Sequence, residues 1–226
     1  MLNEQLRKNL DDVIWNIEEA RIRVSEHHIV KLVAVGKYSD EENIKSLYQL
    51  GQRAFGENQV QQLESRTKNL EELPLEWHMM GRLQSNKINK LIELRPALFQ
   101  SLDSLSLAQA LNQRLEAKNQ TMSCLLQINS ANEAEKAGLS IEKAEETYSK
   151  IIESCPQIKL KGIMSIGAHS EDQKIVRKSF EESYKIYEKM VHKHNATICS
   201  MGMSNDYKLA IECGSNLVRI GSKIFK

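Results

Sequence analysis

Eight short apolar segments, separated by stretches of helical periodicity, constrain the fold of this chain more than any other feature. They occupy residues 29–35, 53–55, 76–81, 97–101, 122–129, 159–166, 196–201 and 216–220. Between them, apolar residues recur at helical spacing, as at Leu105, Ala108, Leu111 and Leu115, which predicts amphipathic helices. Eight strands that alternate with helices predict an α/β fold, a closed (β/α)8 barrel of the TIM type. An open, doubly wound sheet is the alternative.

One more helix is predicted ahead of the first apolar segment, over residues 5 to about 26. Its apolar stripe contains Leu6, Leu10, Val13, Ile17 and Val24, whereas almost nothing follows the last apolar segment. We therefore expect this extra N-terminal helix to cover the gap between the last and first strands. No low-complexity tract or Gly/Ser-rich linker divides the chain, so we expect one domain over residues 1–226.

Charge and cysteine usage exclude several classes of function. The 31 lysines and arginines nearly balance the 30 acidic residues, and a net charge of +1 provides no field for holding nucleic acid or an anionic membrane. The four cysteines form no CxxC pair, which argues against a zinc site and a disulfide framework. No segment resembles a signal peptide or a membrane span. We expect a soluble, cytoplasmic protein.

Residues 199–222 contain two turns suited to binding an anion. The first turn ends at Ser204, whose hydroxyl precedes the backbone N–H groups of a predicted helix. The second turn, residues 219–222, offers the Arg219 guanidinium, an unhindered amide at Gly221 and the Ser222 hydroxyl. Each turn is a weak signal alone. Together, after neighbouring strands of one barrel, they predict a phosphate site.

Lys37 follows the first apolar segment, at the predicted mouth of the barrel. In a closed barrel the first strand neighbours the last, so Lys37 is expected beside the phosphate turns. Position alone favours an ordinary solvated lysine. Next to a bound phosphate compound, the amine can pair with the anion or form a Schiff base with an aldehyde. The pattern leaves both roles open.

Other residues near the predicted mouth have structural alternatives. Asn58 is equally suited to contact a ligand or to cap the next helix, and residues 84–87 combine the same two possibilities. Met201 and Met203 are more typical of core filler than of ligand contacts. His78, alone within a strand, is expected to be structural. Helix caps are predicted at Ser39 (in a capping box with Glu42), Ser104, Ser140 and Ser204.

Seven ordered segments make the chain similar to a known family. They are LVAVGK (32–37), GQRAFGENQVQ (51–61), EWHMMGRLQSNK (76–87), LLQIN (125–129), KGIMSI (161–166), SMGMSND (200–206) and GSNLVRIGSKIF (214–225). On these motifs the chain resembles the pyridoxal phosphate homeostasis proteins of the YggS/PROSC type. The resemblance implies a single barrel like the cofactor-binding domain of alanine racemases. It also implies a role in intracellular vitamin B6 balance, without an established enzymatic activity.

The resemblance further implies pyridoxal 5′-phosphate as the cofactor, held as a Schiff base on Lys37. The expected contacts are Lys37, Asn58, Met203, Ser204, Asn205, Arg219, Gly221 and Ser222. Arg219 would face the pyridine nitrogen, and because a guanidinium does not normally take up a proton, the cofactor would be a poor electron sink. The chain departs from the family pattern at Arg82, where histidine or proline is expected, and at Gly36, where serine is common.

Two functions are compatible with these residues. The first is a non-catalytic carrier or buffer of the cofactor, with apo-enzymes that require it as candidate partners. The second is a pyridoxal phosphate-dependent amino-acid racemase, which needs a second acid/base group opposite the lysine. Alanine racemases take that tyrosine from another domain and subunit, which this chain is not expected to have; Tyr38 and Tyr207 are the candidates near the mouth. The carrier, as a monomer without catalytic residues or metal, is the favoured prediction.

Overall fold

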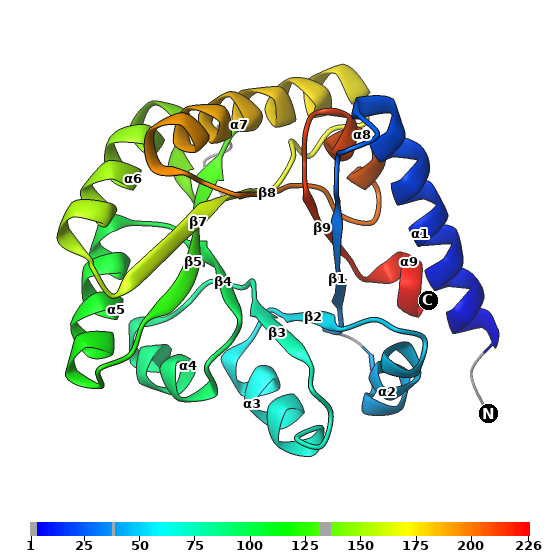
Figure 1. The fold of residues 1–226 in the computed structure, drawn as a ribbon, viewed down its shortest axis with the longest axis horizontal. Coiled ribbons are helices and arrows are strands. Elements are labelled where there is room, and N and C mark those ends of the chain that lie inside the picture. The colour runs from blue at the N-terminus through cyan, green and yellow to red at the C-terminus, as the bar shows by residue number, and fades with distance from the viewer. Residues whose placement is uncertain (1–3, 38, 132–136) are drawn as a thin grey trace.

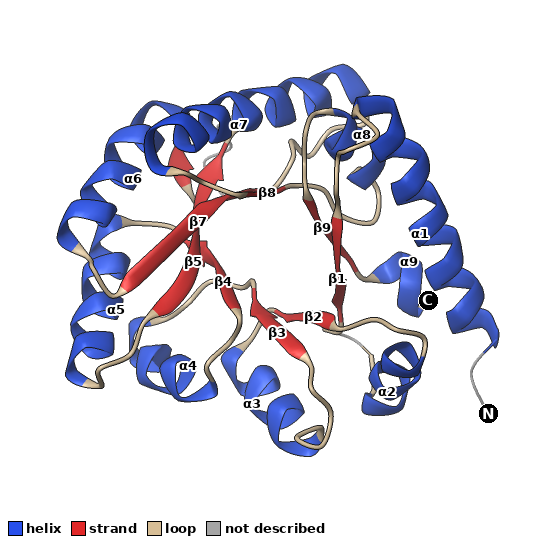
Figure 2. Cartoon of the chain, viewed as in Figure 1, coloured by secondary structure: helices blue, strands red, loops and turns tan. Residues whose placement is uncertain are grey.

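Eight parallel strands form a closed ring in the computed structural model, which describes residues 4–37, 39–131 and 137–226 (Figures 1 and 2). In ring order they are β1 (Lys31–Val35), β2 (Ala54–Glu57), β3 (Glu76–Met79), β4 (Leu98–Leu102), β5 (Met122–Asn129), β7 (Ile158–Ser165), β8 (Ile198–Ser200) and β9 (Leu217–Ile220). Pairing of β4 with β5 and of β9 with β1 closes the ring. The barrel prediction is confirmed, and the open-sheet alternative is wrong. A two-residue strand, β6 (Leu139–Ser140), pairs with the end of β5.

Helices surround the ring (Figure 2). They are α1 (Glu4–Val24), α2 (Glu41–Gln49), α3 (Val60–Asn69), α4 (Ile88–Leu94), α5 (Leu105–Ala117), α6 (Ile141–Ser154), α7 (Gln173–His194), α8 (Tyr207–Glu212) and α9 (Ser222–Phe225), with the 3₁₀ turn η1 (Ser85–Lys87) before α4. Because side chains alternate along a strand, each strand contributes to two cores. A large apolar cluster lies between strands and helices. A smaller one fills the barrel and includes Val33, Leu98, Leu125 and Leu217.

Helix α1 packs against α8 and α9, the helices that follow the last two strands, and against α2, which follows the first. It buries Leu6, Leu10, Val13, Ile17 and Ala20 in this contact. The helix therefore covers the seam between the last and first strands, as expected. Val24, placed on the buried stripe by its spacing, is instead 41% exposed at the last residue of the helix.

The cap predictions are partly wrong. Ser104 does cap α5, since its hydroxyl accepts from the Leu107 N–H at 3.3 Å. Helix α2 is capped by Asp40, which accepts from the Asn43 N–H at 2.8 Å, and not by Ser39. Ser140 occupies the N-cap position of α6 without a side-chain cap bond. Ser204 lies two residues before the N-cap of α8, so its hydroxyl is directed elsewhere.

A buried ion pair lies beside the loop that follows β1. Glu57, at the end of β2, is fully buried, and its Oε1 lies 3.6 Å from Nε of Arg66 on α3. Among the described residues, neither Glu57 oxygen has a hydrogen-bond partner. Arg66 also donates to the Ser39 carbonyl in the loop. Burial raises the pKa of Glu57 to about 7, although Arg66 opposes the shift.

Space for the Glu57 carboxylate comes from the glycine that precedes Lys37. A Cβ atom on Gly36 would lie 2.9 Å from Glu57 Oε1, closer than real Cβ atoms approach. The Gly36 N–H donates to Gly56 O, and the Gly36 carbonyl accepts from the Ser39 N–H. The Lys37 loop is therefore held on one side by these backbone bonds and on the other by Arg66.

We expect Glu57→Gln to stabilise the protein more at high than at low pH. The folded-state pKa of about 7 lies above the ordinary 4.5. Ionisation of this carboxyl therefore costs stability progressively as pH rises through that window. Because glutamine cannot ionise, the unfolding free energy of the variant relative to wild type should rise by on the order of 2–3 kcal/mol between about pH 5 and about pH 8. Urea unfolding at several pH values measures it.

Glu41→Gln is the matched control, because Glu41 Oε1 lies 4.0 Å from Nη1 of the same arginine on the more exposed side. We expect it to change stability little, as exposed ion pairs do. A relative stability of Glu57→Gln that stays constant over this pH range would contradict the raised pKa of the Glu57 carboxyl.

Candidate functional site

A cavity of about 1400 Å³ opens at the carboxyl ends of the strands. Its wall comes mainly from the loops after β1, β2, β3, β7, β8 and β9, the end of the barrel where ligands bind in this fold. All eight residues predicted from the sequence line it: Lys37, Asn58, Met203, Ser204, Asn205, Arg219, Gly221 and Ser222. The fold thus brings together residues from opposite ends of the chain.

Strand pairing places Lys37 beside the two predicted anion-binding turns. Val33 of β1 is in register with Arg219 of β9, and Ala34 with Ile220. Lys37 follows β1 by two residues, so it lies next to the loop that begins at Gly221, directly after β9. The side chain is partly buried and lines the cavity.

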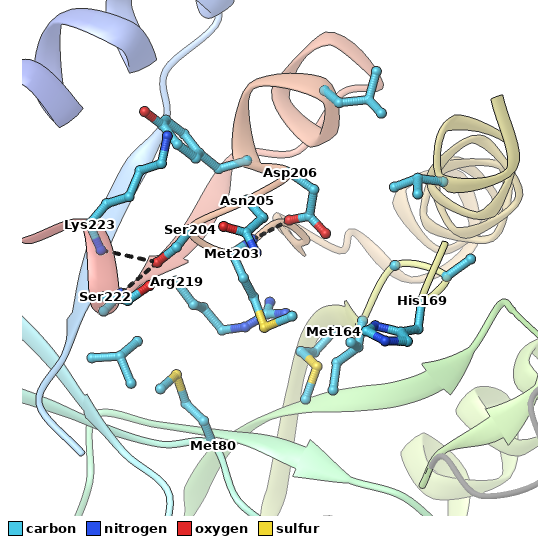
Figure 3. Close-up of a pocket in the computed structure, with 18 of the residues that line it drawn as sticks. Met80, Met164, His169, Met203, Ser204, Asn205, Asp206, Arg219, Ser222 and Lys223 are labelled. Carbon is cyan, nitrogen blue, oxygen red and sulfur yellow. Dashed lines mark hydrogen bonds between the residues drawn. The ribbon is translucent and has the colours of Figure 1, made fainter. Parts of the chain in front are cut away.

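The two turns meet at the Ser204 hydroxyl. Ser204 is 9% exposed, and its Oγ accepts from the backbone N–H of Gly221 at 3.3 Å and of Lys223 at 3.4 Å (Figure 3). Gly202 shapes the first turn, since its φ of +92° suits glycine. Its carbonyl accepts from the Arg219 N–H at 3.0 Å. The Ser204 hydroxyl, from the loop after β8, therefore meets two backbone N–H groups from the segment after β9 at one point of the cavity wall.

Gly221 approaches the first strand closely. A Cβ atom here would lie 3.0 Å from the Val35 carbonyl oxygen and 3.3 Å from Val35 Cβ. The sequence suggested that glycine at this position leaves room for an anion. The crowding that the structure shows comes from β1, so a side chain at 221 would press on the strand that carries Lys37.

The Arg219 side chain is 5% exposed, and it points into the cavity from β9 (Figure 3). Its Nη1 donates to Ser200 Oγ at 2.6 Å, and its Nη2 donates to the Ser165 carbonyl at 2.8 Å. Burial lowers the pKa of Arg219 to about 10, while the Asp206 carboxylate opposes the shift. The guanidinium therefore remains charged at neutral pH and is fixed by two hydrogen bonds.

Asn58 is a cavity residue and not a helix cap. The N-cap position of α3 belongs to Gln59. A Cβ atom on Gly81 would lie only 1.7 Å from the Asn58 carbonyl oxygen, so the loop after β3 supports Asn58 through direct backbone contact. Of residues 84–87, Gln84 stands at the N-cap of η1 without a side-chain cap bond.

Several lining residues were not singled out by the sequence patterns. They are Met80, Met164, His169, Asp206 and Lys223, and Figure 3 shows the thioethers of Met80, Met164 and Met203 around the cavity. Met80 directly follows β3 and Met164 lies beside the end of β7, a position that could have marked both from the sequence. His169 and Asp206 lie further along their loops and Lys223 lies in α9, so no such signal marks them. Arg82, noted from the sequence, also lines the cavity.

The remaining candidates lie outside the cavity or away from its centre. Met201 is fully buried in the core, as expected of a filler residue. Tyr207 borders the cavity but is 2% exposed, and its ring lies 5.5 Å from Lys223 Nζ. Tyr38 lies outside the described residues. His78 is buried and hydrogen-bonded to Gln100 and Glu76, in agreement with a structural role.

Within the described ranges, no cluster of three or more His, Cys, Asp or Glu side chains is arranged to bind a metal. All four cysteines are buried as thiols. Among the helices of the same ranges, none combines the length and apolar character needed to cross a membrane.

Comparison with known sequences identifies close relatives. The model of the alanine racemase N-terminal domain matches residues 9–226. The chain is 52% identical to the pyridoxal phosphate homeostasis protein of Helicobacter pylori strain J99 over 97% of this chain and 98% of that protein. It is 32% identical to the protein of the same name from Aquifex aeolicus, over 96% of each.

Solved structures give the same result. PipY of Synechococcus elongatus with pyridoxal phosphate bound is 28% identical, with a TM-score of 0.80, over 93% of this chain and 100% of that one. An alanine racemase of Clostridium difficile, 17% identical, shares the fold with a TM-score of 0.77 over 98% of this chain and 56% of the racemase. The barrel, the matching domain model and these relatives show that the chain belongs to the family of pyridoxal phosphate homeostasis proteins.

Proposed function

We propose that the protein binds pyridoxal 5′-phosphate in the cavity and acts as a carrier or buffer of this cofactor in vitamin B6 balance. The observation that carries the proposal is the meeting of three groups at one barrel mouth. These are the Lys37 amine, the donors around Ser204 and the Arg219 guanidinium. The relative PipY, which has the same fold, was solved with this cofactor bound.

The donors around Ser204 fit a phosphate group. The N–H groups of Gly221 and Lys223 make bonds of 3.3 and 3.4 Å to the Ser204 hydroxyl, longer than typical N–H···O bonds. A phosphate dianion is a stronger acceptor than a hydroxyl oxygen. Ser204, Ser222 and the backbone N–H groups of Asn205, Gly221 and Ser222 would hold it.

Lys37 and Arg219 fit the remaining parts of the cofactor. Pyridoxal phosphate supplies an aldehyde that condenses reversibly with a primary amine. Lys37 would provide that amine, and Asn58 and Met203 would flank the ring. Arg219 would donate a hydrogen bond to the ring nitrogen without transferring a proton, since its pKa of about 10 lies well above neutrality. An unprotonated ring nitrogen disfavours carbanion chemistry, which supports storage over catalysis.

The position of Tyr207 also supports the carrier. A racemase that works from both faces needs a second acid/base group opposite the lysine. The Tyr207 hydroxyl is buried, and burial raises its pKa, so it is poorly suited to exchange protons with a ligand. We propose that the protein works as a monomeric, single-domain cytoplasmic carrier whose recipients are apo-enzymes that require the cofactor.

Reduction with borohydride should fix the cofactor on Lys37. We expect purified protein mixed with pyridoxal phosphate to show a visible absorbance band that borohydride removes. Peptide mass mapping should then find the added pyridoxyl mass on Lys37. Lys37→Ala should lose both signals. Lys208→Ala is the control, because Lys208 also lines the cavity but is paired with Glu19, and it should retain the label. Labelling that persists elsewhere in Lys37→Ala would place the anchor at another residue.

The carrier should not exchange the α-hydrogen of amino acids. We expect no measurable deuterium incorporation when the loaded protein is incubated with alanine and other amino acids in deuterated water, followed by proton NMR. The physical reason is that Arg219 would leave the ring nitrogen of the cofactor unprotonated, and such a ring is a weak electron sink for a carbanion. Robust exchange that disappears in Lys37→Ala would instead favour the racemase.

Ser204→Ala should weaken binding only when the ligand carries a phosphate. Loss of one hydrogen bond to a charged group should raise the Kd for pyridoxal phosphate about 10–150-fold. Affinity for pyridoxal, which lacks the phosphate, should stay unchanged. Ser170→Ala, which changes an exposed serine in the loop after β7, should alter neither. Equal losses for both ligands would show that Ser204 does not contact the phosphate.

A further inference from the structure

Three polar side chains lie inside the barrel and take no part in the proposed contacts. His78 of β3 is 1% exposed, whereas Gln100 of β4 and Ser200 of β8 are fully buried. Buried polar groups cost free energy unless they are hydrogen-bonded. An apolar interior would avoid this cost, so their arrangement calls for a physical explanation.

These side chains form a continuous chain of hydrogen bonds that starts at the cavity. Arg219 Nη1 lies 2.6 Å from Ser200 Oγ. Ser200 Oγ lies 2.7 Å from Gln100 Oε1, and Gln100 Nε2 lies 2.8 Å from His78 Nδ1. The chain therefore connects strands on opposite sides of the ring, β8 and β9 with β3 and β4.

Beyond His78 the chain reaches the other end of the barrel. His78 Nε2 lies 2.8 Å from Glu76 Oε1, and Lys31 Nζ lies 2.5 Å from the same oxygen. Glu76 and Lys31 begin their strands and are partly exposed. The hydrogen bond from His78, ahead of that from Lys31, lowers the pKa of Glu76 to about 2. Its carboxylate is thus an ionised acceptor.

The two charged ends of the chain, the Arg219 guanidinium and the Glu76 carboxylate, together fix the direction of its bonds. A guanidinium can only donate, so Ser200 accepts from it and directs its own hydrogen to the Gln100 carbonyl oxygen. The Gln100 amide nitrogen then faces His78, which accepts at Nδ1 and carries its hydrogen on Nε2. That hydrogen is donated to Glu76. All donors and acceptors match, and a single tautomer of His78 is selected.

We propose that Ser200 and Gln100 are positioning residues for Arg219, and that their chain through the barrel holds the guanidinium in the orientation that a pyridine nitrogen requires. The role in ligand binding rests on the proposed function. Besides this chain, the Ser165 carbonyl is the second anchor of Arg219. A hydrogen bond to a ring nitrogen is directional, so a guanidinium that rotates would lose it. The chain therefore supplies rigidity where a ring nitrogen would meet the guanidinium.

The first measurement uses the protein without ligand. Nitrogen-15 NMR should show His78 protonated at Nε2 and accepting at Nδ1, and the guanidinium protons of Arg219 should be resolved because rotation is restricted. Ser200→Ala should broaden or merge the Arg219 signals and also shift the His78 ring signals, although Gln100 lies between. Ser101→Ala is the control: Ser101 is a buried neighbour of Gln100 whose hydroxyl bonds the Met80 carbonyl outside the chain. Protonation of His78 at Nδ1, or His78 ring signals that do not respond to Ser200→Ala, would show that the proposed chain of hydrogen bonds does not exist.

The second measurement compares pyridoxal phosphate with an analogue in which carbon replaces the ring nitrogen. Ser200→Ala should raise the Kd for pyridoxal phosphate about 5–10-fold, as loss of one directed hydrogen bond predicts, and leave the analogue unchanged. Ser200→Thr, which keeps the hydroxyl, should restore affinity. Equal weakening of both ligands would overturn the positioning role. If the unsubstituted protein binds neither ligand, the proposed function fails, and the nitrogen spectra alone then decide whether the chain holds Arg219.

Discussion

Parallel pairing between β1 and β9 is the contact on which the rest of the structure depends. It joins residues almost two hundred positions apart in the sequence and closes the ring. Without it, Lys37 and Arg219 would lie at opposite edges of an open sheet. With it, the loop after β1 lies against the loop after β9, and each limits the space of the other, as the contact of Gly221 with Val35 shows. Helix α1 covers the same seam from outside, so the pairing is shielded from water by apolar side chains.

Much of the fold could be predicted from the sequence because strand-length apolar segments and helical periodicity can both be recognised within short stretches of the chain. Apolar segments of strand length alternate with helical periodicity, and this pattern predicted all eight strands of the ring. Lys37 and the turns at Ser204 and Gly221 could be placed in one site because parallel strands of a barrel end on the same face. The spacing of these residues predicts only a phosphate-bearing ligand. The family resemblance then indicates which one, pyridoxal 5′-phosphate.

The details that escaped prediction depend on contacts between distant residues. At the start of α2, Asp40 and Ser39 are both suitable caps, and the bond from the Ser39 N–H to the Gly36 carbonyl keeps Ser39 in the loop. The bonds that Gln100 makes with His78 and Ser200 depend on which side chains face inward on three separate strands. Nothing in the separate segments indicates that register.

The contact between Gly36 and Glu57 bears on how sequences of this family can change. The resemblance to the family leads us to expect serine before the lysine, yet a Cβ atom at position 36 would lie 2.9 Å from the Glu57 carboxylate here. The same substitution would therefore be acceptable or damaging according to the residue, or the rotamer, at position 57. The two positions are epistatic: each restricts the evolutionary paths open to the other, although neither of them is the proposed cofactor anchor.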